Sequence, residues 1–234
     1  MKPNLESSQE YLSWLENWLE NLPPLTLSEP EHIAVLVVDM TNGFCNEGVL
    51  SSPRVNAIVP PIVHLLKTAW ESGVREIYLL NDTHEPDAVE FGAFPPHCVR
   101  GSREAMPVEE IQALSFFTQI KKIEKNSLSS TIETDLLENF KAKPDLTHFV
   151  IVGNCTDLCV YQMAMALRLD ANARQIHDRS VVVPVDCVAT YDTPLEVART
   201  IGAHPHPGDL IHAIFLQHMA LNGVEIVDRV DFNS

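Results

Sequence analysis

The stretch Ile151-Val-Gly-Asn-Cys-Thr-Asp-Leu-Cys-Val160 predicts a buried strand that turns into a helix. The apolar run 149–152 is typical of an interior strand, and a Gly and an Asn then interrupt it. We expect Thr156 to cap the following helix, which places Cys159 in its first turn. The unpaired N–H groups and the helix dipole there favour a thiolate, so Cys159 is a candidate nucleophile. A free cysteine that only packs in the core is the alternative.

Strands and helices alternate around this stretch. Ile33 to Val38 is a continuous apolar run that ends at Asp39, a helical pattern covers 57–70 and closes at Gly73, and 74–80 supplies the next strand. This βαβ spacing requires parallel strands with right-handed crossovers. Further strands are predicted at 116–123, 181–185 and 224–227, and further helices at 131–140, from about residue 194, and at 209–221. The predicted fold class is α/β, a single doubly wound domain with a mostly parallel sheet and helices on both faces.

Residues 1–30 are predicted to form a helical arm ahead of this domain, which we place at 31–234. Apolar side chains recur in the arm at helical spacing until Pro23-Pro24 ends the pattern. They are Tyr11, Leu12, Trp14, Leu15, Trp18 and Leu19. Such a stripe usually packs on its own domain and less often on a second subunit, which leaves a homo-oligomer open.

Charge and cysteine content argue against several classes of protein. The 234 residues include 16 basic and 32 acidic side chains, a net charge of -16, with no basic run to neutralise phosphates. We therefore expect neither nucleic acid nor anionic membrane surfaces as partners. No apolar stretch approaches the roughly 20 residues that a membrane-spanning helix needs. Five cysteines without a CxxC pair or a secretory segment favour the cytosol over a disulfide framework.

Polar or nucleophilic side chains follow the predicted strands at the end where an open parallel sheet binds its ligands. Asp39, Lys125 and Cys159 would supply a base for the thiol proton, a cation for the thiolate, and the nucleophile. Taken singly, a carboxylate just past a buried strand, such as Asp39, is often only a helix or turn cap. A lysine at a strand end, such as Lys125, is usually solvated. The combination of the three favours a catalytic set.

A second set of side chains lies in the loop from 82 to 101. Asp82 and His84 stand two residues apart, so both project to the same side of an extended backbone, and His97 follows two prolines. Two imidazoles and a carboxylate suit Zn²⁺, Mn²⁺ or Fe²⁺ in a site with open positions. Glu90 is a candidate fourth ligand, directly or through water. Loop histidines exposed to solvent are the alternative.

With these motifs the sequence resembles the isochorismatase-like cysteine hydrolases, and within them the nicotinamidases, most closely those of the plant type. The matching pieces lie between roughly residues 31 and 228. They are Val-Val-Asp39-Met-Thr-Asn-Gly-Phe44, Asp82-Thr-His84, Phe94-Pro-Pro-His97-Cys, Lys125 and Gly153-Asn-Cys-Thr-Asp-Leu-Cys159-Val. The Thr-Asp-x-Cys-Val element is specific to the superfamily, whereas Asp-x-His with Pro-Pro-His points to nicotinamidase.

The resemblance implies hydrolysis of nicotinamide, a small amide, to nicotinate and ammonia through a cysteine thioester, in NAD salvage. It implies a triad of Asp39, Lys125 and Cys159. It also implies a divalent metal, zinc first with manganese or iron as alternatives. The implied ligands are Asp82, His84 and His97, with Glu90 matching a ligand in some members.

Three further features follow from the resemblance alone. The peptide bond between Asn154 and Cys155 is expected to be cis. The backbone N–H groups of Cys155 and Cys159 are expected to form an oxyanion hole. Phe44 and Phe94 are expected to line the pocket for the substrate ring.

The sequence departs from the family pattern at two places, and the first of them bears on the shape of the pocket and so on the substrate. Thr131 stands where many members carry an aromatic residue after the lysine, and the arm before residue 30 has no family counterpart. One alternative is a related amidase acting on a carbamoyl compound or maleamate. Another is a catalytically silent domain whose Trp14 and Trp18 arm binds a partner protein. Isochorismatase itself is disfavoured, because vinyl-ether hydrolysis does not need Cys159.

Overall fold

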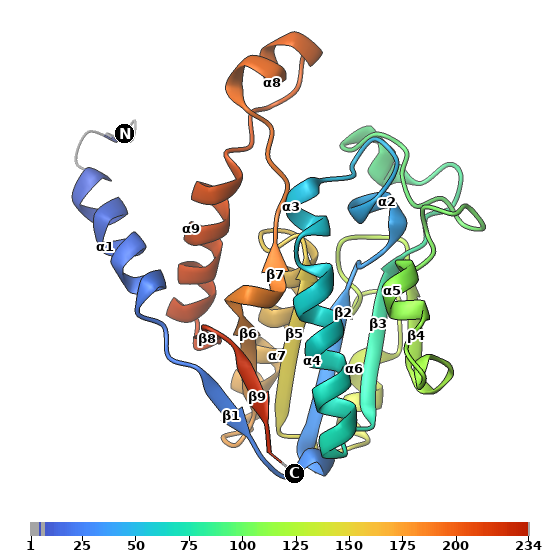
Figure 1. The fold of residues 1–234 in the computed structure, drawn as a ribbon, viewed down its shortest axis with the longest axis vertical. Helices are drawn as coiled ribbons and strands as arrows, with labels where there is room; N and C mark the ends of the chain where they lie inside the picture. The colour runs from blue at the N-terminus through green and yellow to red at the C-terminus, as the bar shows by residue number, and fades with distance from the viewer. Residues whose placement is uncertain (1–4, 6–7, 234) are drawn as a thin grey trace.

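A parallel sheet of seven strands forms the centre of the protein (Figure 1). This computed structural model describes residue 5 and residues 8–233. The strand order is β4-β3-β2-β5-β6-β8, and the short β7 pairs with the end of β5. The bounds are Ile33–Val38 (β2), Glu76–Asp82 (β3), Lys121–Lys125 (β4), His148–Asn154 (β5), Ser180–Pro184 (β6), Val188–Ala189 (β7) and Glu225–Val227 (β8). The predicted α/β class with a parallel sheet is confirmed.

The chain reverses its direction across the sheet between β2 and β5. From β2 it moves outward through β3 to β4, and it then returns to build β5, β6 and β8 on the other side. Folds of this kind bind ligands at that switch point, beyond the carboxyl ends of the strands. Gly153 of β5 pairs with Val38 of β2 there, and its φ is +116°. A Cβ atom on Gly153 would lie 2.0 Å from the carbonyl oxygen of Val38, so the two strand ends approach this closely only with glycine.

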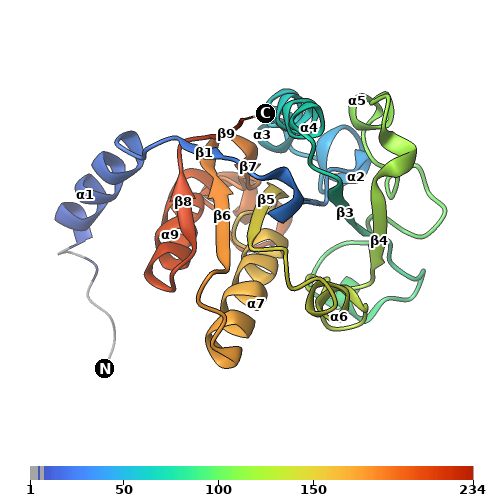
Figure 2. The same cartoon turned by 90° about the horizontal axis from the view of Figure 1, so that it is seen from below.

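Helices cover both faces of the sheet (Figure 2). One face packs against α4 (Val59–Ser72), and the other packs against α6 (Leu136–Lys141), α7 (Cys159–Arg174) and α9 (Gly208–Leu221). Along β2, Val35 and Val37 belong to the core on the α4 side, whereas Leu36 and Val38 belong to the core on the α7 side. This alternation follows from the two-residue period of a strand, and it explains why β2 is apolar throughout.

The remaining helices are short and lie in the connections. They are α2 (Asn42–Cys45), α3 (Pro53–Asn56), α5 (Glu109–Gln112) and α8 (Leu195–Ile201), together with 3-10 turns at Pro30–His32, Val89–Gly92, Phe117–Gln119 and Val185–Cys187. Most of these segments follow the carboxyl ends of strands. They therefore shape the surroundings of the site more than the core.

The segment before β2 consists of a helix and a strand. The helix α1 (Ser8–Glu20) lies beside α9, where Leu15 is buried and the Tyr11 hydroxyl donates to Oε1 of Gln217 at 3.1 Å. The strand β1 (Leu25–Leu27) pairs in parallel with β9 (Val230–Phe232), a small sheet that the sequence did not predict. The aromatic stripe packs on its own domain in part, because Trp18 contacts the core while Trp14 stays half exposed. The boundary of the arm at residue 30 remains a prediction.

Two predicted elements begin at the wrong residue. The strand predicted at 116–123 is wrong in its first half: 117–119 form a 3-10 turn, and β4 begins at Lys121. Phe116 is buried because its ring stacks on Trp70 with 4.5 Å between the centroids. The helix predicted at 131–140 begins only at Leu136. The preceding Ser and Thr hydroxyls, including that of Thr134 toward the Ser130 carbonyl, bond within the loop and compete with helix formation.

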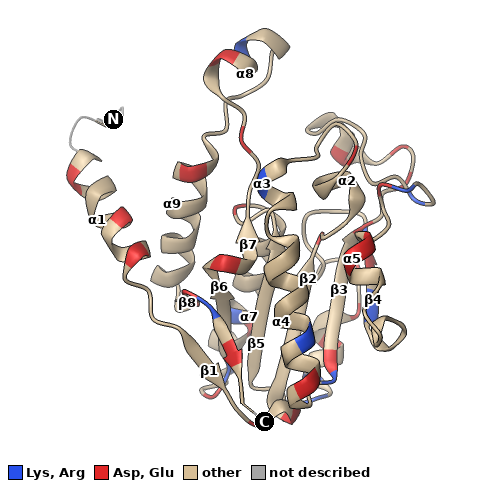
Figure 3. Ribbon diagram, in the orientation of Figure 1, with Lys and Arg blue, Asp and Glu red and all other residues tan. Residues whose placement is uncertain are grey.

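Acidic side chains are spread over many elements of the protein (Figure 3). The helix α1 carries three glutamates and no Lys or Arg, as Figure 3 also shows. Within residues 8–233 no helix has both the length and the apolarity to cross a bilayer. The expected absence of a nucleic acid partner remains a prediction from the charge.

Candidate active site

The structure brings together three of the predicted residues at the switch point. Asp39 follows β2, Lys125 ends β4, and Cys159 begins α7 just beyond β5. The Lys125 ammonium lies 2.9 Å from Oδ2 of Asp39 and 3.6 Å from Sγ of Cys159. It also contacts Oδ1 of Asp82 at the end of β3. All four side chains are buried, so a nucleophile, a cation and two carboxylates share one water-poor environment.

The backbone around Asp39 fixes the direction of its carboxylate. Asp39 has a φ of 53°, in the left-handed region that aspartate tolerates better than most residues. The N–H of Asp82 donates to Oδ1 of Asp39 at 2.7 Å, and the Asn154 side-chain amide donates to the Asp39 carbonyl at 2.6 Å. These bonds hold Oδ2 toward Lys125, and they link the ends of β2, β3 and β5.

Cys159 lies in the first turn of α7, as predicted, yet the expected thiolate is wrong for this structure. Burial raises the pKa of Cys159 well above its ordinary value, because a thiolate there loses its hydration. Lys125 lowers that pKa, but the nearby carboxylates of Asp39 and Asp82 raise it. The helix terminus and a single ammonium are therefore outweighed by burial and two carboxylates. Cys159 rests as a thiol and needs a base.

The two carboxylates have opposite pKa shifts. Burial, and next the neighbouring charge of Asp82, raise the pKa of Asp39 to about 6, although Lys125 opposes them. Burial also acts to raise the pKa of Asp82, but Lys125 and the imidazoles of His84 and His97 outweigh it and lower that pKa. Lys125 keeps its charge because the same carboxylates, despite its burial, raise its pKa well above 10.5. Asp39 is thus the carboxylate suited to accept and return a proton near neutral pH.

The segment between β5 and α7 presents two backbone donors. The peptide bond between Asn154 and Cys155 is cis, as the resemblance implied. Among the described residues, neither the N–H of Cys155 nor that of Cys159 donates a backbone hydrogen bond outside the regular helices and strands. The predicted cap by Thr156 is wrong: its hydroxyl bonds to Nδ1 of His212 at 2.9 Å, and the residue before α7 is Leu158.

The structure also gathers the predicted metal ligands. One ligand atom from each of Asp82, His84, Glu90 and His97 lies within 4.8 Å of the others. Nε2 of His84 lies 3.6 Å from Oδ2 of Asp82 and 3.8 Å from Oε1 of Glu90, and Nε2 of His97 lies 3.7 Å from Oδ2 of Asp82. Ligands bound to zinc at about 2.0–2.2 Å in a tetrahedron stand roughly 3.4 Å apart, so these separations are close to those of a metal site.

Buried polar atoms without a hydrogen-bond partner show that this set of ligand atoms fits a cation. Among the described residues, Oδ2 of Asp82, Nε2 of His84 and Oε1 of Glu90 are buried without a hydrogen-bond partner. Nδ1 of His84 lies 3.1 Å from Oδ1 of Asn126, and Nδ1 of His97 lies 2.9 Å from the Pro95 carbonyl. Because both oxygens accept, each Nδ1 donates a hydrogen bond, and Nε2 is the ring nitrogen that faces the other candidate ligands. These residues fit a divalent metal with mixed nitrogen and oxygen ligands.

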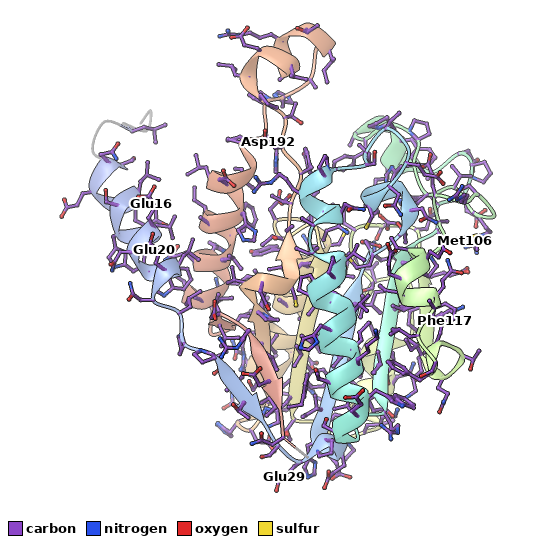
Figure 4. All side chains as sticks on the ribbon, viewed as in Figure 1. Glu16, Glu20, Glu29, Met106, Phe117 and Asp192 are labelled. Carbon is purple, nitrogen blue, oxygen red and sulfur yellow. The ribbon has the colours of Figure 1, made fainter. Side chains whose placement is uncertain are left out.

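A cavity of about 700 Å³ connects the two sets of side chains. Cys159 and Cys155 lie in its wall together with Asp82, Glu90 and His97. The predicted aromatic residues Phe44 and Phe94 line it, whereas Thr131 does not appear in the lining and Leu128 does. The outer wall comes from 191–193 and 201–204, on either side of α8. Asp192, labelled in Figure 4, lies in the first of these segments, at the base of α8.

Sequence reasoning assigned no supporting role to Asn126 and Asn154, whose side chains form hydrogen bonds to site residues. Asn126 directly follows Lys125, and its place at a strand end was the signal that could have found it. Asn154 stood in the quoted stretch, but its bond to the Asp39 carbonyl depends on the pairing of β2 with β5. The outer wall around α8 carries no chemical motif, so only the fold reveals that it reaches the cavity.

Comparison with known proteins identifies the family. The Isochorismatase domain model matches residues 33–228, which leaves α1, β1 and β9 outside the matched range. Nicotinamidase 1 of Arabidopsis thaliana is 29% identical over 230 residues, which cover 90% of this chain and 91% of that protein.

Solved structures share this fold. The pyrazinamidase of Pyrococcus horikoshii in complex with zinc has a TM-score of 0.61 at 23% identity, covering 84% of this chain and 98% of its own. The N-carbamoylsarcosine amidase of Thermoplasma acidophilum has a TM-score of 0.58 at 27% identity, covering 76% of this chain and 96% of its own. Since the family model extends from β2 through β8 and includes both sides of the switch point, the chain belongs to the isochorismatase family.

Proposed function

We propose that this protein is a nicotinamidase, an amidohydrolase that converts nicotinamide and water to nicotinate and ammonia. One observation carries the proposal: Cys159 and three of the four candidate metal ligands, Asp82, Glu90 and His97, line the same cavity. The similarity to Nicotinamidase 1 over 90% of this chain supports it. A heteroaromatic amide has two features to recognise, its carboxamide and its ring nitrogen, and this cavity offers a separate group for each.

In the first half of the reaction Asp39 accepts the proton of the Cys159 thiol. The sulfur attacks the carboxamide carbon, and the carbonyl π electrons move to oxygen. The backbone N–H groups of Cys155 and Cys159 would hold this oxyanion, while Lys125 balances the charge of the two carboxylates. When the carbonyl forms again, the C–N bond breaks and Asp39 returns the proton to the departing nitrogen. Ammonia leaves, and a thioester remains on Cys159.

The second half uses the same groups in reverse. Asp39 accepts a proton from water as the water oxygen attacks the thioester carbon. The C–S bond then breaks, and the proton on Asp39 returns to the sulfur. The acid that is released gives its hydroxyl proton to solvent and leaves as nicotinate. The pKa of Asp39, raised to about 6 chiefly by burial, suits a group that must hold and release a proton in each half. The buried position of Lys125 between two carboxylates keeps it charged throughout.

The metal is part of the same proposal. Asp82, His84 and His97 would hold a divalent ion, with Glu90 as the fourth ligand, and zinc is the first choice over manganese or iron. When bound, the ion supplies a Lewis-acid position that a pyridine nitrogen can ligate. Phe44 and Phe94 would enclose the ring and keep water from its faces.

A second candidate substrate is a carbamoyl compound. It is favoured by the 27% identity to the N-carbamoylsarcosine amidase, and by a cavity whose volume of about 700 Å³ exceeds the needs of a single ring. The test is ammonia release from nicotinamide, benzamide, N-carbamoylsarcosine and maleamate, each with and without a chelator. We expect the highest kcat/KM for nicotinamide and a loss of that preference with the chelator. A higher value for N-carbamoylsarcosine would replace the proposal, and no release from any amide would indicate a silent domain.

A further inference from the structure

Residues 190–207, which we call the strap, connect β7 to α9 and carry α8 (Figure 1). In Figure 1 α8 stands away from the rest of the ribbon at the top of the molecule. The strap closes at its base, where the Thr193 N–H donates to the His206 carbonyl at 2.8 Å and the His206 N–H donates to the Thr193 carbonyl at 2.9 Å. The Gly208 N–H donates to Oδ1 of Asp192 at 2.7 Å. The outer wall of the cavity is therefore a loop with a fixed base.

His206 joins this base to the segment that carries the nucleophile. Its ring stacks on Tyr191 with 3.9 Å between centroids, and its Nδ1 lies 3.0 Å from the Tyr191 carbonyl. Its Nε2 lies 2.9 Å from Oδ2 of Asp157, and Oδ1 of Asp157 accepts the hydroxyl hydrogen of Thr190. The side chains of His206 and Asp157 are 13% and 6% exposed. The mechanism described above uses none of these groups.

The ring of His206 lies between two oxygen acceptors, the Tyr191 carbonyl and the Asp157 carboxylate. A peptide carbonyl only accepts hydrogen bonds, and an ionised carboxylate only accepts as well. Both ring nitrogens of His206 lie within hydrogen-bond distance of such an oxygen. The pair is largely desolvated, and removal of either partner leaves a buried polar group without its hydrogen bond. Breaking the contact between His206 and Asp157 is therefore costly in free energy.

We propose that His206 and Asp157 are positioning residues. They hold in place the two backbone N–H groups, of Cys155 and Cys159, that donate to the oxyanion. Asp157 lies two residues after Cys155 and two before Cys159, whose N–H groups point to the oxyanion in the proposed reaction. The pair anchors this segment to the base of the strap. The inference rests on the proposed function in assigning a role to those donors. Displacement of such groups by about 1 Å costs roughly 10²-fold in rate, so a contact remote from the substrate can control turnover.

Two substitutions of one residue separate the contacts of His206. The amide nitrogen of His206→Gln reaches the place of Nε2 and keeps a donor for Asp157. The shorter His206→Asn places its amide nitrogen near Nδ1 and keeps only the bond to the Tyr191 carbonyl. Asp157→Ala removes the acceptor and serves as a second disruption. His177→Asn, the same change at an exposed histidine, is the matched control.

We expect His206→Asn and Asp157→Ala to lower kcat by about 10-fold or more with KM within about threefold of wild type, because the donors act in the transition state. His206→Gln and the control should stay within about threefold in both constants. A pair that only stabilises the fold would lower the melting temperature and leave kcat per folded molecule unchanged. Equal losses in the Gln and Asn variants, or a change confined to KM, would overturn the proposal.

Amide hydrogen exchange provides a readout that needs no substrate. Exchange over residues 154–160 should speed up in His206→Asn and Asp157→Ala, but not in His206→Gln or His177→Asn. Unchanged exchange in both disrupted variants would overturn the inference whatever their kinetics. If the wild type hydrolyses no nicotinamide but exchange responds as expected, then the proposed function fails and the anchoring role of the pair remains.

Discussion

The ammonium of Lys125 lies 2.9 Å from Oδ2 of Asp39, and neither side chain is exposed to solvent. The same ammonium contacts Asp82, so one buried cation balances two buried carboxylates. Lys125 is therefore as much a structural requirement of the site as a chemical one. Removing a charge from such an arrangement leaves the remaining charges without hydration or a partner.

Lys125→Met should lower the free energy of unfolding by about 3–5 kcal/mol, because the methionine fills the space while both carboxylates remain buried. Urea unfolding at pH 7.5, followed by circular dichroism, measures this change. Asp39→Asn in the Lys125→Met background should recover part of the loss, since it removes one uncompensated charge. A single variant as stable as wild type would show that water reaches these carboxylates.

Cys159→Ala should abolish ammonia release and leave the fold intact, because alanine is slightly smaller than the thiol it replaces. Turnover per active site and the melting temperature are measured together. Cys155→Ala should be much milder, since only the backbone N–H of Cys155 is proposed to act. Equal losses in the two variants would mean that the nucleophile has been misassigned.

Asp39 should control the acid side of the pH–rate profile. Its pKa is raised to about 6, chiefly by burial, and it must be ionised to accept the thiol proton. Consequently kcat/KM should rise as the pH increases through about 6 and level off above it. Asp39→Asn should lower kcat by about 10²- to 10⁴-fold and remove the dependence near pH 6. The same inflection in both proteins would exclude Asp39 as the proton acceptor.

The metal-ligand set predicts a preference for a ring nitrogen. Nicotinamide should be hydrolysed far better than benzamide, which has the same carboxamide on a ring without nitrogen. His84→Ala or His97→Ala should reduce this preference while Cys159 still reacts with iodoacetamide. The kcat/KM of both amides in wild type and variants, with the metal content of each protein, decides the matter. Equal values for the two amides in metal-loaded wild type would remove the orienting role of the ion.

His212, which is not one of the candidate metal ligands, should make the stability of the protein depend on pH. Burial, and next the charge of Arg54, lower the pKa of His212 to about 4 from 6.5. As the pH falls, His212 is therefore protonated in the unfolded chain before it is protonated in the folded chain. The contribution of neutral His212 to the free energy of unfolding is complete above about pH 6.5 and is lost as the pH falls to about 4. The total loss is about 3 kcal/mol at 1.36 kcal/mol per pKa unit.

His212→Asn keeps a polar atom near Thr156 and removes the titration, so it serves as the control for that decline. Melting temperatures of both proteins between pH 4 and 7.5 test the prediction. Parallel curves would assign the pH dependence to other groups.

The sequence by itself determined the elements and the chemical groups. The apolar runs of β2 and β5 and the helical period of α4 follow from burial on one or two faces, a local property of the residues. The positions of Asp39, Lys125 and Cys159 after predicted strands were sufficient to propose that they meet, because parallel strands end at one edge. Asp82, His84, Glu90 and His97 could be proposed as one site from chemistry and spacing, aided by the family resemblance.

Only the tertiary structure decided the state and the surroundings of those groups. The helix terminus suggested a thiolate at Cys159, but burial beside Asp39 and Asp82 reverses that expectation, and burial is a property of the assembled fold. Local rules also placed Thr156 as a cap, yet its hydroxyl bonds to His212, which is 56 residues away. The contact between His206 and Asp157 spans 49 residues. Such pairings depend on where the sheet and its crossovers place distant segments, which no local pattern encodes.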